Sequence, residues 1–329
     1  MSMVMLAICI VVSAATPLLT MVLIHLERRY GLLCTDVHKA ERPSIPCIGG
    51  FSVASGFILG IALSHILDII SFTEALGIGI SIALSLLIGV IDDLNGLKSR
   101  EKILLGLLPA LPIIILGLYT PRPWAPFLGH ARLTIVYPIL ILLAFTVYQN
   151  GANMIDTHNG TLPLFALSVH LFALLLKLWT ASQPSHISLL LIFIAVLASY
   201  LPFNIYPAKI FNGNTGSFII GSSLAISAIL LRAEIYYILA SIPMFINGFY
   251  YITSVKGFLQ KEKVKRPTHV DDRGCIHPST DRYAPVTLVR ITVALSRSPL
   301  NEKELVTILY TVFILTSLTS LTITLLLGY

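Results

Sequence analysis

The sequence predicts an all-α, polytopic integral membrane protein with about ten transmembrane helices and both termini on the non-cytoplasmic side. The chain has 329 residues, of which 56% are hydrophobic and only 12% are charged, whereas soluble domains average about 25% charged residues. A mean hydropathy of +0.86 requires many spanning segments rather than a single anchor. The basic residues also gather in alternate loops, which indicates which loops face the cytoplasm.

The apolar segments are the first elements to justify. About 20 apolar residues cross a bilayer as a helix, and backbone groups in hydrocarbon must bond within their own segment. The segments that meet this length lie at 4–25, 47–67, 74–91, 103–119, 133–152, 161–181, 186–204, 216–231, 234–256 and 305–327. The first lacks a basic region before it, so we expect a membrane helix rather than a signal peptide. The whole chain, 1–329, is expected to be one transmembrane domain.

The charged loops give the orientation. The loops after odd-numbered segments contain Arg28, Arg29, Lys39, Arg42, Lys98, Arg100, Lys102 and Lys209, and a basic loop at about 257–304 holds nine more, from Lys261 to Lys303. The loops after even-numbered segments contain only Arg122, Arg132 and Arg232. Positive loops stay in the cytoplasm, so both termini are expected outside. Such clusters suit anionic substrates and lipid headgroups, and they do not indicate nucleic acid.

Two smaller expectations concern cysteines and the basic loop. The four cysteines, Cys9, Cys34, Cys47 and Cys275, form no CxxC pair, and we expect free thiols without a metal framework. The stretch 284–295 is apolar apart from one arginine and is expected to form a membrane-surface or re-entrant segment. Ser298 and Pro299 are expected to open the last helix as its N-cap and first residue.

Asp92 and Asp93 are the first candidates for chemistry. They follow the apolar run GISIALSLLIGVI directly. Adjacent carboxylates at a membrane boundary repel each other and lose hydration, and a helix C-terminus disfavours negative charge. They therefore need a cation, which Lys98, Arg100, Lys102 or Mg²⁺ would supply. An acidic helix end without a function would give the same letters.

A second polar segment ends the fifth apolar run. Asn153, Asp156 and Asn159 are spaced by three residues, so a continuing helix would place them near one face. Their oxygens suit a hard cation or the polar edge of a nucleotide. Ordinary capping, with Asn159-Gly160 as a helix stop, remains the alternative.

A third segment, Phe211 to Ser217 (FNGNTGS), precedes the eighth apolar run, and Lys209 lies just before it. Its glycines permit close backbone approach to a ligand, and a helix N-terminus favours phosphate. A tight turn with an N-cap explains the same letters.

The basic loop supplies the fourth segment, Pro267-Thr268-His269, with Arg266, Arg273, His277 and Arg282 nearby. Its cations suit a diphosphate. A solvated positive loop is the alternative.

Taken in order, these segments resemble the polyprenyl-phosphate N-acetylhexosamine-1-phosphate transferases of glycosyltransferase family 4. The resemblance covers nearly the whole chain and rests on the following stretches: Asp36 to Lys39 with Pro46 and Gly49-Gly50, IGVIDDLNGLKSREKILLG, NMIDTHNG, PAKIFNGNTGSFIIG and the Pro-x-His of the basic loop. The spacing after the acid pair and the form NMIDTHNG look like the archaeal and eukaryotic dolichyl-phosphate branch.

The resemblance implies a fold and an activity. Family members have ten transmembrane helices with both ends outside. They transfer a sugar-1-phosphate, here most similar to GlcNAc-1-phosphate, from a UDP-sugar to polyprenyl or dolichyl phosphate, with Mg²⁺ or Mn²⁺ as cofactor. The expected location is the cell or endoplasmic reticulum membrane, with the site facing the cytoplasm. Partners would be these substrates and membrane lipid, and a homodimer remains open.

The resemblance also implies roles at the phosphates and the metal. Asp92 and Asp93 would act at the lipid phosphate, and Lys102 would steady phosphate charge. Asn153 and Asn214 would hold the metal ion, and His269 would contact the diphosphate.

Further residues are implied in substrate binding. Phe211 would stack on uracil and Asn159 would meet its edge. The other substrate-binding candidates are Lys39, Asp156, Lys209 and Arg273. The assignment requires that residues from all these loops open on one pocket.

Two departures from the family pattern leave other functions open. Asn214 replaces a metal-binding acid, and Val270 stands where eukaryotic relatives place an arginine that helps read the sugar, for which Arg273 would substitute. A non-catalytic paralogue that binds lipid or nucleotide therefore remains an alternative, as does a secondary transporter for an anionic solute.

Overall fold

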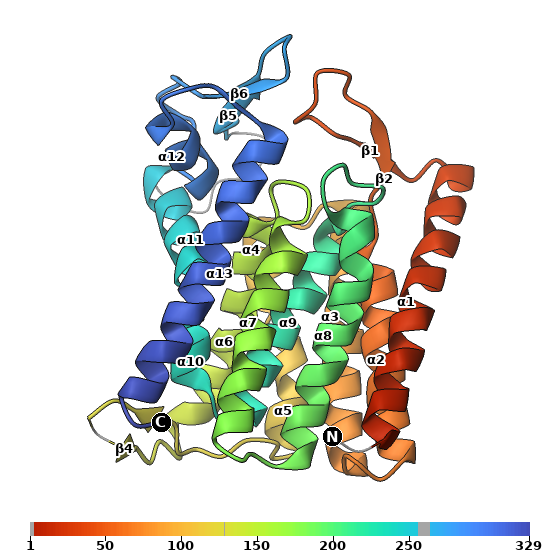
Figure 1. Cartoon of the computed structure of the whole chain (residues 1–329), viewed down its shortest axis with the longest axis vertical. Coiled ribbons are helices and arrows are strands. Elements are labelled where there is room, and N and C mark those ends of the chain that lie inside the picture. Colours follow the sequence, from red (N-terminus) through yellow and green to blue (C-terminus); the bar gives the residue numbers. More distant parts are fainter. Residues whose placement is uncertain (1–2, 128, 256–263) are drawn as a thin grey trace.

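The computed structural model describes residues 3–127, 129–255 and 264–329 and shows a bundle of long helices with short strands at its ends (Figure 1). The long helices are α1 (Met3–Tyr30), α2 (Gly50–Ile66), α3 (Phe72–Asn95), α6 (Val136–Ile155), α7 (Thr161–Trp179), α8 (Pro184–Asn204), α9 (Gly213–Leu230) and α13 (Glu302–Leu326). The short ones are α4 (Ser99–Leu105), η1 (Leu108–Ala110), α5 (Leu111–Ile115), α10 (Glu234–Ala240), α11 (Ile242–Ser254) and α12 (Leu288–Leu295).

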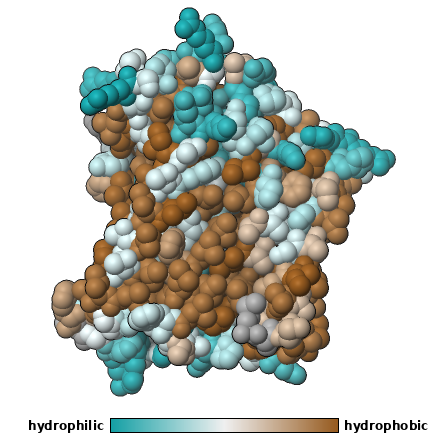
Figure 2. Space-filling model, viewed as in Figure 1, coloured by the Kyte–Doolittle hydropathy of each residue, from teal (hydrophilic) through white to brown (hydrophobic). Residues whose placement is uncertain are grey.

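The surface of the bundle is that of a multi-pass membrane protein. Apolar side chains cover the middle of the face seen in Figure 2, and hydrophilic side chains gather at both ends. Within the described residues, seven helices are long and apolar enough to cross a membrane, or eight if the bent pair α10–α11 is one span. Both ends of the chain lie at the lower end of the bundle in Figure 1, opposite β1, β5 and α12.

Helix α9 forms the centre of this bundle. Every residue from Thr215 to Ile229 is buried, and α3 and α6 pack along it. Close approach is possible because small residues face the neighbours: a Cβ added at Gly89 of α3 would collide with the backbone of Thr215. Inside the bundle, Ser222 accepts a hydrogen bond of 2.8 Å from Gln149 and lies 2.7 Å from the hydroxyl of Ser85. Small residues and interhelical hydrogen bonds are what hold helices together in lipid.

Two predicted spans are broken in the structure. The segment 103–119 is divided among α4, η1 and α5, because Pro109 and Pro112 interrupt the helical hydrogen bonds. The segment 234–256 bends by 60° between α10 and α11, where Pro243 opens the second helix. Residue 256 lies outside the described residues.

The strands lie outside the helical bundle and depart from an all-α fold. Strand β1 (Leu33–Thr35) pairs antiparallel with β2 (Ser44–Pro46), and β3 (Trp124–Ala125) pairs with β4 (Gly129–His130). Strand β6 (Cys275–Pro278) lies between β5 (Thr268–Val270) and β7 (Leu300–Asn301). The described part of the basic loop is thus folded, and α12 occupies the apolar stretch predicted as a surface or re-entrant segment. Residues 257–263 of that loop lie outside the described residues.

The predictions of four free thiols and of the start of the last helix are wrong. Cys34 and Cys47 form a disulfide, while Cys9 and Cys275 are free. The antiparallel pairing of Cys34 with Ile45 brings the two cysteines together, with their Cα atoms 5.6 Å apart. Helix α13 begins after Asn301, whose side chain accepts a hydrogen bond from the backbone N–H of Glu304 in a capping box.

Candidate active site

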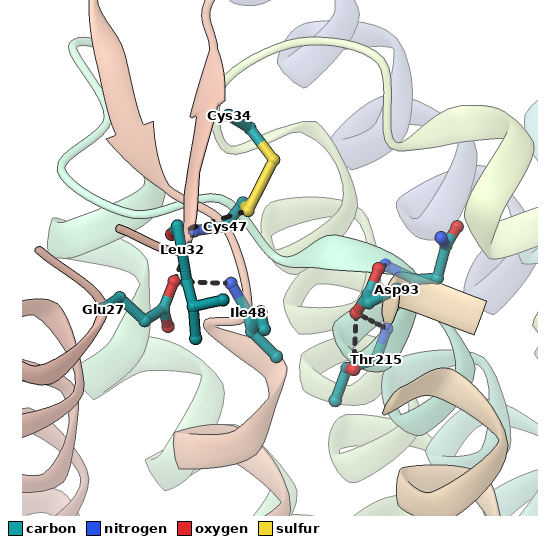
Figure 3. The surroundings of a disulfide bond; sticks show 8 residues. Glu27, Leu32, Cys34, Cys47, Ile48, Asp93 and Thr215 are labelled. Carbon is teal, nitrogen blue, oxygen red and sulfur yellow. Dashed lines mark hydrogen bonds between the residues drawn. A yellow bond between two sulfur atoms is a disulfide. The ribbon is translucent and has the colours of Figure 1, made fainter. Parts of the chain in front are cut away.

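A cavity of about 620 Å³ opens at the upper end of the bundle, where α3, α6 and α9 have their polar ends. Its wall includes a set of residues that we call the helix-end wall: Asp93, Asn153, Asp156, Phe211 and Asn214. Three of these come from the helix termini and two from the adjoining loops. The β1–β2 hairpin with its disulfide lies on the opposite side (Figure 3).

Asp93 is held against the N-terminus of α9. One carboxylate oxygen accepts the backbone N–H of Asn214 at 2.7 Å, and the other accepts the N–H and the hydroxyl of Thr215 at 2.9 and 2.6 Å (Figure 3). These N–H groups have no partner within their own helix, so a carboxylate there is favourable. Gly213 makes the approach possible, because it has φ of +68° and a Cβ there would meet Asp93 at 2.7 Å.

Asp92 has a different environment from its neighbour. It is 3% exposed, lies 2.5 Å from the ammonium of Lys102, and accepts the backbone N–H of Leu97 at 2.9 Å. Both residues were predicted as site residues, and the predicted cation for the acid pair is present. Neither Asp92 nor Lys102, however, lines the cavity.

The two predicted metal ligands meet directly. The amide of Asn153, in the last turn of α6, donates to the side-chain oxygen of Asn214, in the first turn of α9, at 2.5 Å. The helix expected to carry Asn153, Asp156 and Asn159 on one face ends at Ile155. The loop that follows still brings Asp156 and Asn159 to the same cavity.

Asp156 is a half-buried carboxyl next to the start of α9. It accepts hydrogen bonds from Asn212 at 2.8 Å and from Ser217 at 3.3 Å. Desolvation raises the pKa of Asp156 to about 7, against the opposing effect of these two hydrogen bonds. The carboxyl is thus balanced between its neutral and charged forms near neutral pH.

Phe211 lines the cavity, whereas Lys209 does not. The backbone of Phe211 is fixed by hydrogen bonds from its N–H to Pro46 and from Gly49 to its carbonyl oxygen, both of 2.8 Å. Lys209 is exposed, with its ammonium 5.9 Å from the ring centre of Phe203.

Lys39 and Asn159 meet at a glutamate that the sequence did not single out. The amide of Asn159 donates to Glu302 at 2.8 Å, and the ammonium of Lys39 lies 3.7 Å from the other oxygen of Glu302 and also pairs with Asp36. Glu302 is the first residue of α13 and is 4% exposed. The signal in the sequence that could have identified Glu302 was an acidic residue directly before the last apolar segment.

A second cavity, of about 700 Å³, adjoins the first and contains basic residues, among them Lys39, Arg266 and His269. His38 and His158 line both cavities, and their rings stack with centres 4.0 Å apart. Burial lowers the pKa of both imidazoles, so they are neutral near pH 7. The sequence did not single out either histidine, although both lie inside the motifs Asp36 to Lys39 and NMIDTHNG.

The basic loop brings only part of its predicted set to these cavities. His269 is exposed on β5, opposite His277 of β6, with ring centres 5.5 Å apart. Arg273 lies in the exposed turn between these strands and lines neither cavity, whereas Val270 lines the second. The expected single pocket is therefore two adjoining cavities at one end of the bundle, with Asp93 rather than Asp92 on the wall.

Comparison with known proteins finds similarity to one family. The model of glycosyl transferase family 4 matches residues 75–232, which contain the helix-end wall. A "Putative UDP-N-acetylglucosamine--dolichyl-phosphate N-acetylglucosaminephosphotransferase" of Saccharolobus solfataricus is 31% identical over 191 residues, which are 57% of this chain and 59% of that protein. The chain thus spans about three fifths of this relative's length.

Two further relatives match over longer stretches. A protein of Sulfolobus acidocaldarius with the same name is 28% identical over 77% of both chains. A "Probable undecaprenyl-phosphate N-acetylglucosaminyl 1-phosphate transferase" of Bacillus subtilis is 26% identical over 73% of this chain and 66% of its own. The order of the polar segments and their convergence at one end of the bundle agree with these matches: over residues 75–232 the chain is similar to glycosyl transferase family 4.

Proposed function

We propose that the protein transfers a sugar-1-phosphate from a UDP-sugar to a polyprenyl phosphate, giving a polyprenyl-diphospho-sugar and UMP. The names of the two archaeal relatives favour N-acetylglucosamine as the sugar and dolichyl phosphate as the acceptor. The observation that carries the proposal is the helix-end wall, which places an aromatic ring, two carboxylates and two amides around one cavity.

The two cavities suit different parts of a nucleotide sugar. In the first, Phe211 offers a ring on which a base would stack. In the second, the cationic side chains of Lys39 and Arg266 and the exposed imidazole of His269 suit a diphosphate and its sugar. We place the diphosphate at the boundary between the cavities, beside His38 and His158.

The donor set of the first cavity fits Mg²⁺ or Mn²⁺. Asp93, Asp156, Asn153 and Asn214 offer only hard oxygen ligands. Among residues 3–127, 129–255 and 264–329, no group of three or more His, Cys, Asp or Glu side chains is placed to hold a metal ion. The substrate phosphates would therefore complete the coordination, as is usual for Mg²⁺. A metal ion held by these residues would supply positive charge that offsets the charge of the diphosphate.

The reaction is a phosphoryl-type transfer controlled by alignment and charge. An oxygen of the lipid phosphate attacks the phosphorus that carries the sugar, and the bond from this phosphorus to the bridging oxygen of UMP breaks. Asp93 is the member of the acid pair that can face the reactants, because it lines the cavity. Asp92 and Lys102 neutralise each other and hold the end of α3 in place.

We further propose that the upper end of the bundle faces the cytoplasm and both termini face the outside. The basic residues of the loops Lys98 to Lys102 and Lys265 to Lys303 belong to that end, and positive loops remain cytoplasmic. The lipid phosphate would then reach the site at the cytoplasmic headgroup level. Labelling of Cys275 in sealed inverted and right-side-out vesicles tests this orientation.

The decisive experiment is a UMP-release assay with purified protein, short polyprenyl phosphate, Mg²⁺ and a panel of UDP-sugars. We expect UMP and a lipid-linked sugar in equal amounts, with UDP-GlcNAc the best donor. Binding of UDP-GlcNAc without UMP release, over several lipids and metals, would instead indicate a binding protein. Solute uptake into vesicles without UMP release would indicate a transporter.

A further inference from the structure

Glu302 is a buried carboxyl group bonded to Asn159, which lines the first cavity, and neither the motifs nor the proposed chemistry assigns it a role. It is 4% exposed and opens α13. One of its oxygens accepts the side-chain N–H of Asn159 at 2.8 Å and lies 3.4 Å from the backbone N–H of the same residue. The other oxygen lies 3.7 Å from the ammonium of Lys39.

A second contact from α13 fixes the backbone of Asn159. The hydroxyl of Tyr310 donates to the carbonyl oxygen of Asn159 at 2.5 Å. Asn159 is 3% exposed and yet lines the cavity. Its position is therefore set by the last helix, although it belongs to the loop between α6 and α7.

The chemistry of Glu302 decides which way the Asn159 amide points. The oxygen of Glu302 nearest to Asn159 accepts a hydrogen bond, whereas an amide has a donor end and an acceptor end. The donor end of Asn159 faces Glu302, so the acceptor end, Oδ1, faces away from it. No hydrogen bond to this oxygen comes from the described residues, so Oδ1 is available to a ligand in the cavity that Asn159 lines.

We propose that Glu302 is a positioning residue that makes the nucleotide site selective for uracil over cytosine. This inference rests on the proposed nucleotide site and names what sets its base preference. At ring position 3, uracil carries an N–H donor and cytosine carries a lone pair. An oxygen held toward this position accepts the hydrogen bond of uracil and repels the lone pair of cytosine. Without Glu302 the amide of Asn159 can turn over and donate to cytosine.

The test measures UMP and CMP binding to the full-length protein in detergent with Mg²⁺, by calorimetry. We expect the wild type to bind UMP more tightly than CMP. In Glu302→Ala the ratio of the two dissociation constants should fall about tenfold, since one correctly oriented hydrogen bond decides it. In Glu302→Gln, whose amide can pair with Asn159 in either direction, it should fall severalfold. Glu304→Gln, two residues along and exposed, is the matched control and should keep the wild-type ratio.

Each outcome decides a separate point. An unchanged ratio in both Glu302 variants, or equal weakening of UMP and CMP, would overturn the proposed role and leave Glu302 as a structural residue. A wild type without preference would overturn it as well. If Glu302→Ala does not fold, the isosteric Glu302→Gln decides by the same ratio. Failure of UMP release by a wild type that still prefers UMP would refute the transferase proposal and not this one.

Discussion

The helix-end wall and the basic loop meet at the same end of the molecule, but they are organised differently. In the wall, Asp93 accepts three hydrogen bonds and Asn153 bonds to Asn214 before any ligand is present. In the described part of the basic loop, residues 264–301, His269 and Arg273 are exposed, and the side chain of Arg273 makes no hydrogen bond or ion pair with the described residues. Polar groups near a membrane are fixed where burial requires partners, and they stay adaptable where water supplies them.

The largest effect on activity is expected from Asp93→Asn, which alters the helix-end wall. An amide cannot accept from both Asn214 and Thr215, because its NH₂ end would face one of the backbone N–H groups. We expect transfer of labelled sugar phosphate to fall about a hundredfold or more and the melting temperature to fall as well. The exposed Glu101→Gln, on α4, is the control. Activity of Asp93→Asn within threefold of wild type would show that the wall is not the reactive part of the molecule.

Asn214→Asp should increase the affinity of the helix-end wall for Mg²⁺. An aspartate oxygen still accepts the hydrogen bond from Asn153 and adds a negative charge to the proposed metal site. We expect the Mg²⁺ concentration for half-maximal activity to fall about tenfold, since charge count tunes cation affinity. Asn150 lies one turn before Asn153 on α6 and outside the cavity. Asn150→Asp adds the same charge and should leave the Mg²⁺ requirement unchanged. A Mg²⁺ requirement that does not change in Asn214→Asp would place the ion elsewhere.

The β1–β2 hairpin, on the opposite side of the cavity from the helix-end wall, is held by the disulfide and by nearby hydrogen bonds. Cys47 and Ile48 donate their backbone N–H groups to Glu27 at 2.6 and 3.0 Å next to the disulfide (Figure 3). Replacing Cys34 and Cys47 by serine should lower stability by about 3 kcal/mol, the entropic effect of a closed loop of this size, and so lower the melting temperature. Cys275→Ser should not do so. Equal melting temperatures for oxidised and reduced wild type would contradict this expectation.

A smaller effect is expected on the pH dependence of stability, through the carboxyl group of Asp156. Its pKa is about 7 in the folded protein and 3.8 ordinarily. Between these values the folded protein holds a proton that the unfolded chain has lost, so its contribution to stability is complete below pH 3.8 and falls as pH rises toward 7. Without Mg²⁺, the wild type should therefore melt at lower temperature as pH rises from about 5 to 7.

Asp156→Asn is the matched variant for this measurement, since it keeps the shape and removes the titration. It should show a flatter dependence of melting temperature on pH over the same range. Parallel profiles for the two proteins would mean that Asp156 is ionised throughout.

The smallest effect is expected from Arg273→Ala. Arg273 is exposed and lines neither cavity, so we expect KM for the UDP-sugar to change less than about threefold, within the usual range for exposed charges. His269→Ala, in the second cavity, should change it more. A tenfold rise in KM for Arg273→Ala would show that the basic loop closes over the substrate. The basic loop would then be part of the binding site in the same way as the helix-end wall.

The helices could be predicted from the sequence because lipid imposes a single requirement on every segment. A span must be apolar and must bond its own backbone, so hydropathy locates α1, α3, α7 and α8 within a few residues. The same reasoning fails for α4, η1 and α5, where Pro109 and Pro112 break the helix inside an apolar segment. Asn301 caps the last helix because its capping box is locally complete, whereas Ser298-Pro299 is followed by strand β7.

The sequence indicates which residues belong to the site, but it does not show which of them line the cavity and which only support its wall. Asp92 and Asp93 are adjacent in sequence, yet successive residues point about 100° apart on a helix, so one meets Lys102 and the other meets α9. Cys34 and Cys47 carry no motif, and only the β1–β2 register brings them together. Glu302 reaches Asn159 across 143 positions of chain.

The amino-acid order is enough to predict which segments are apolar enough to enter the membrane, which polar residues border them and which end of the bundle they share. These properties depend on the composition and order of the residues, and hydration acts on each segment separately. Only the folded arrangement shows which carboxylate lines the cavity, which amides are in contact and which way the Asn159 amide points. Those properties depend on distances between helix ends that are remote in the chain, and only packing around α9 sets such distances.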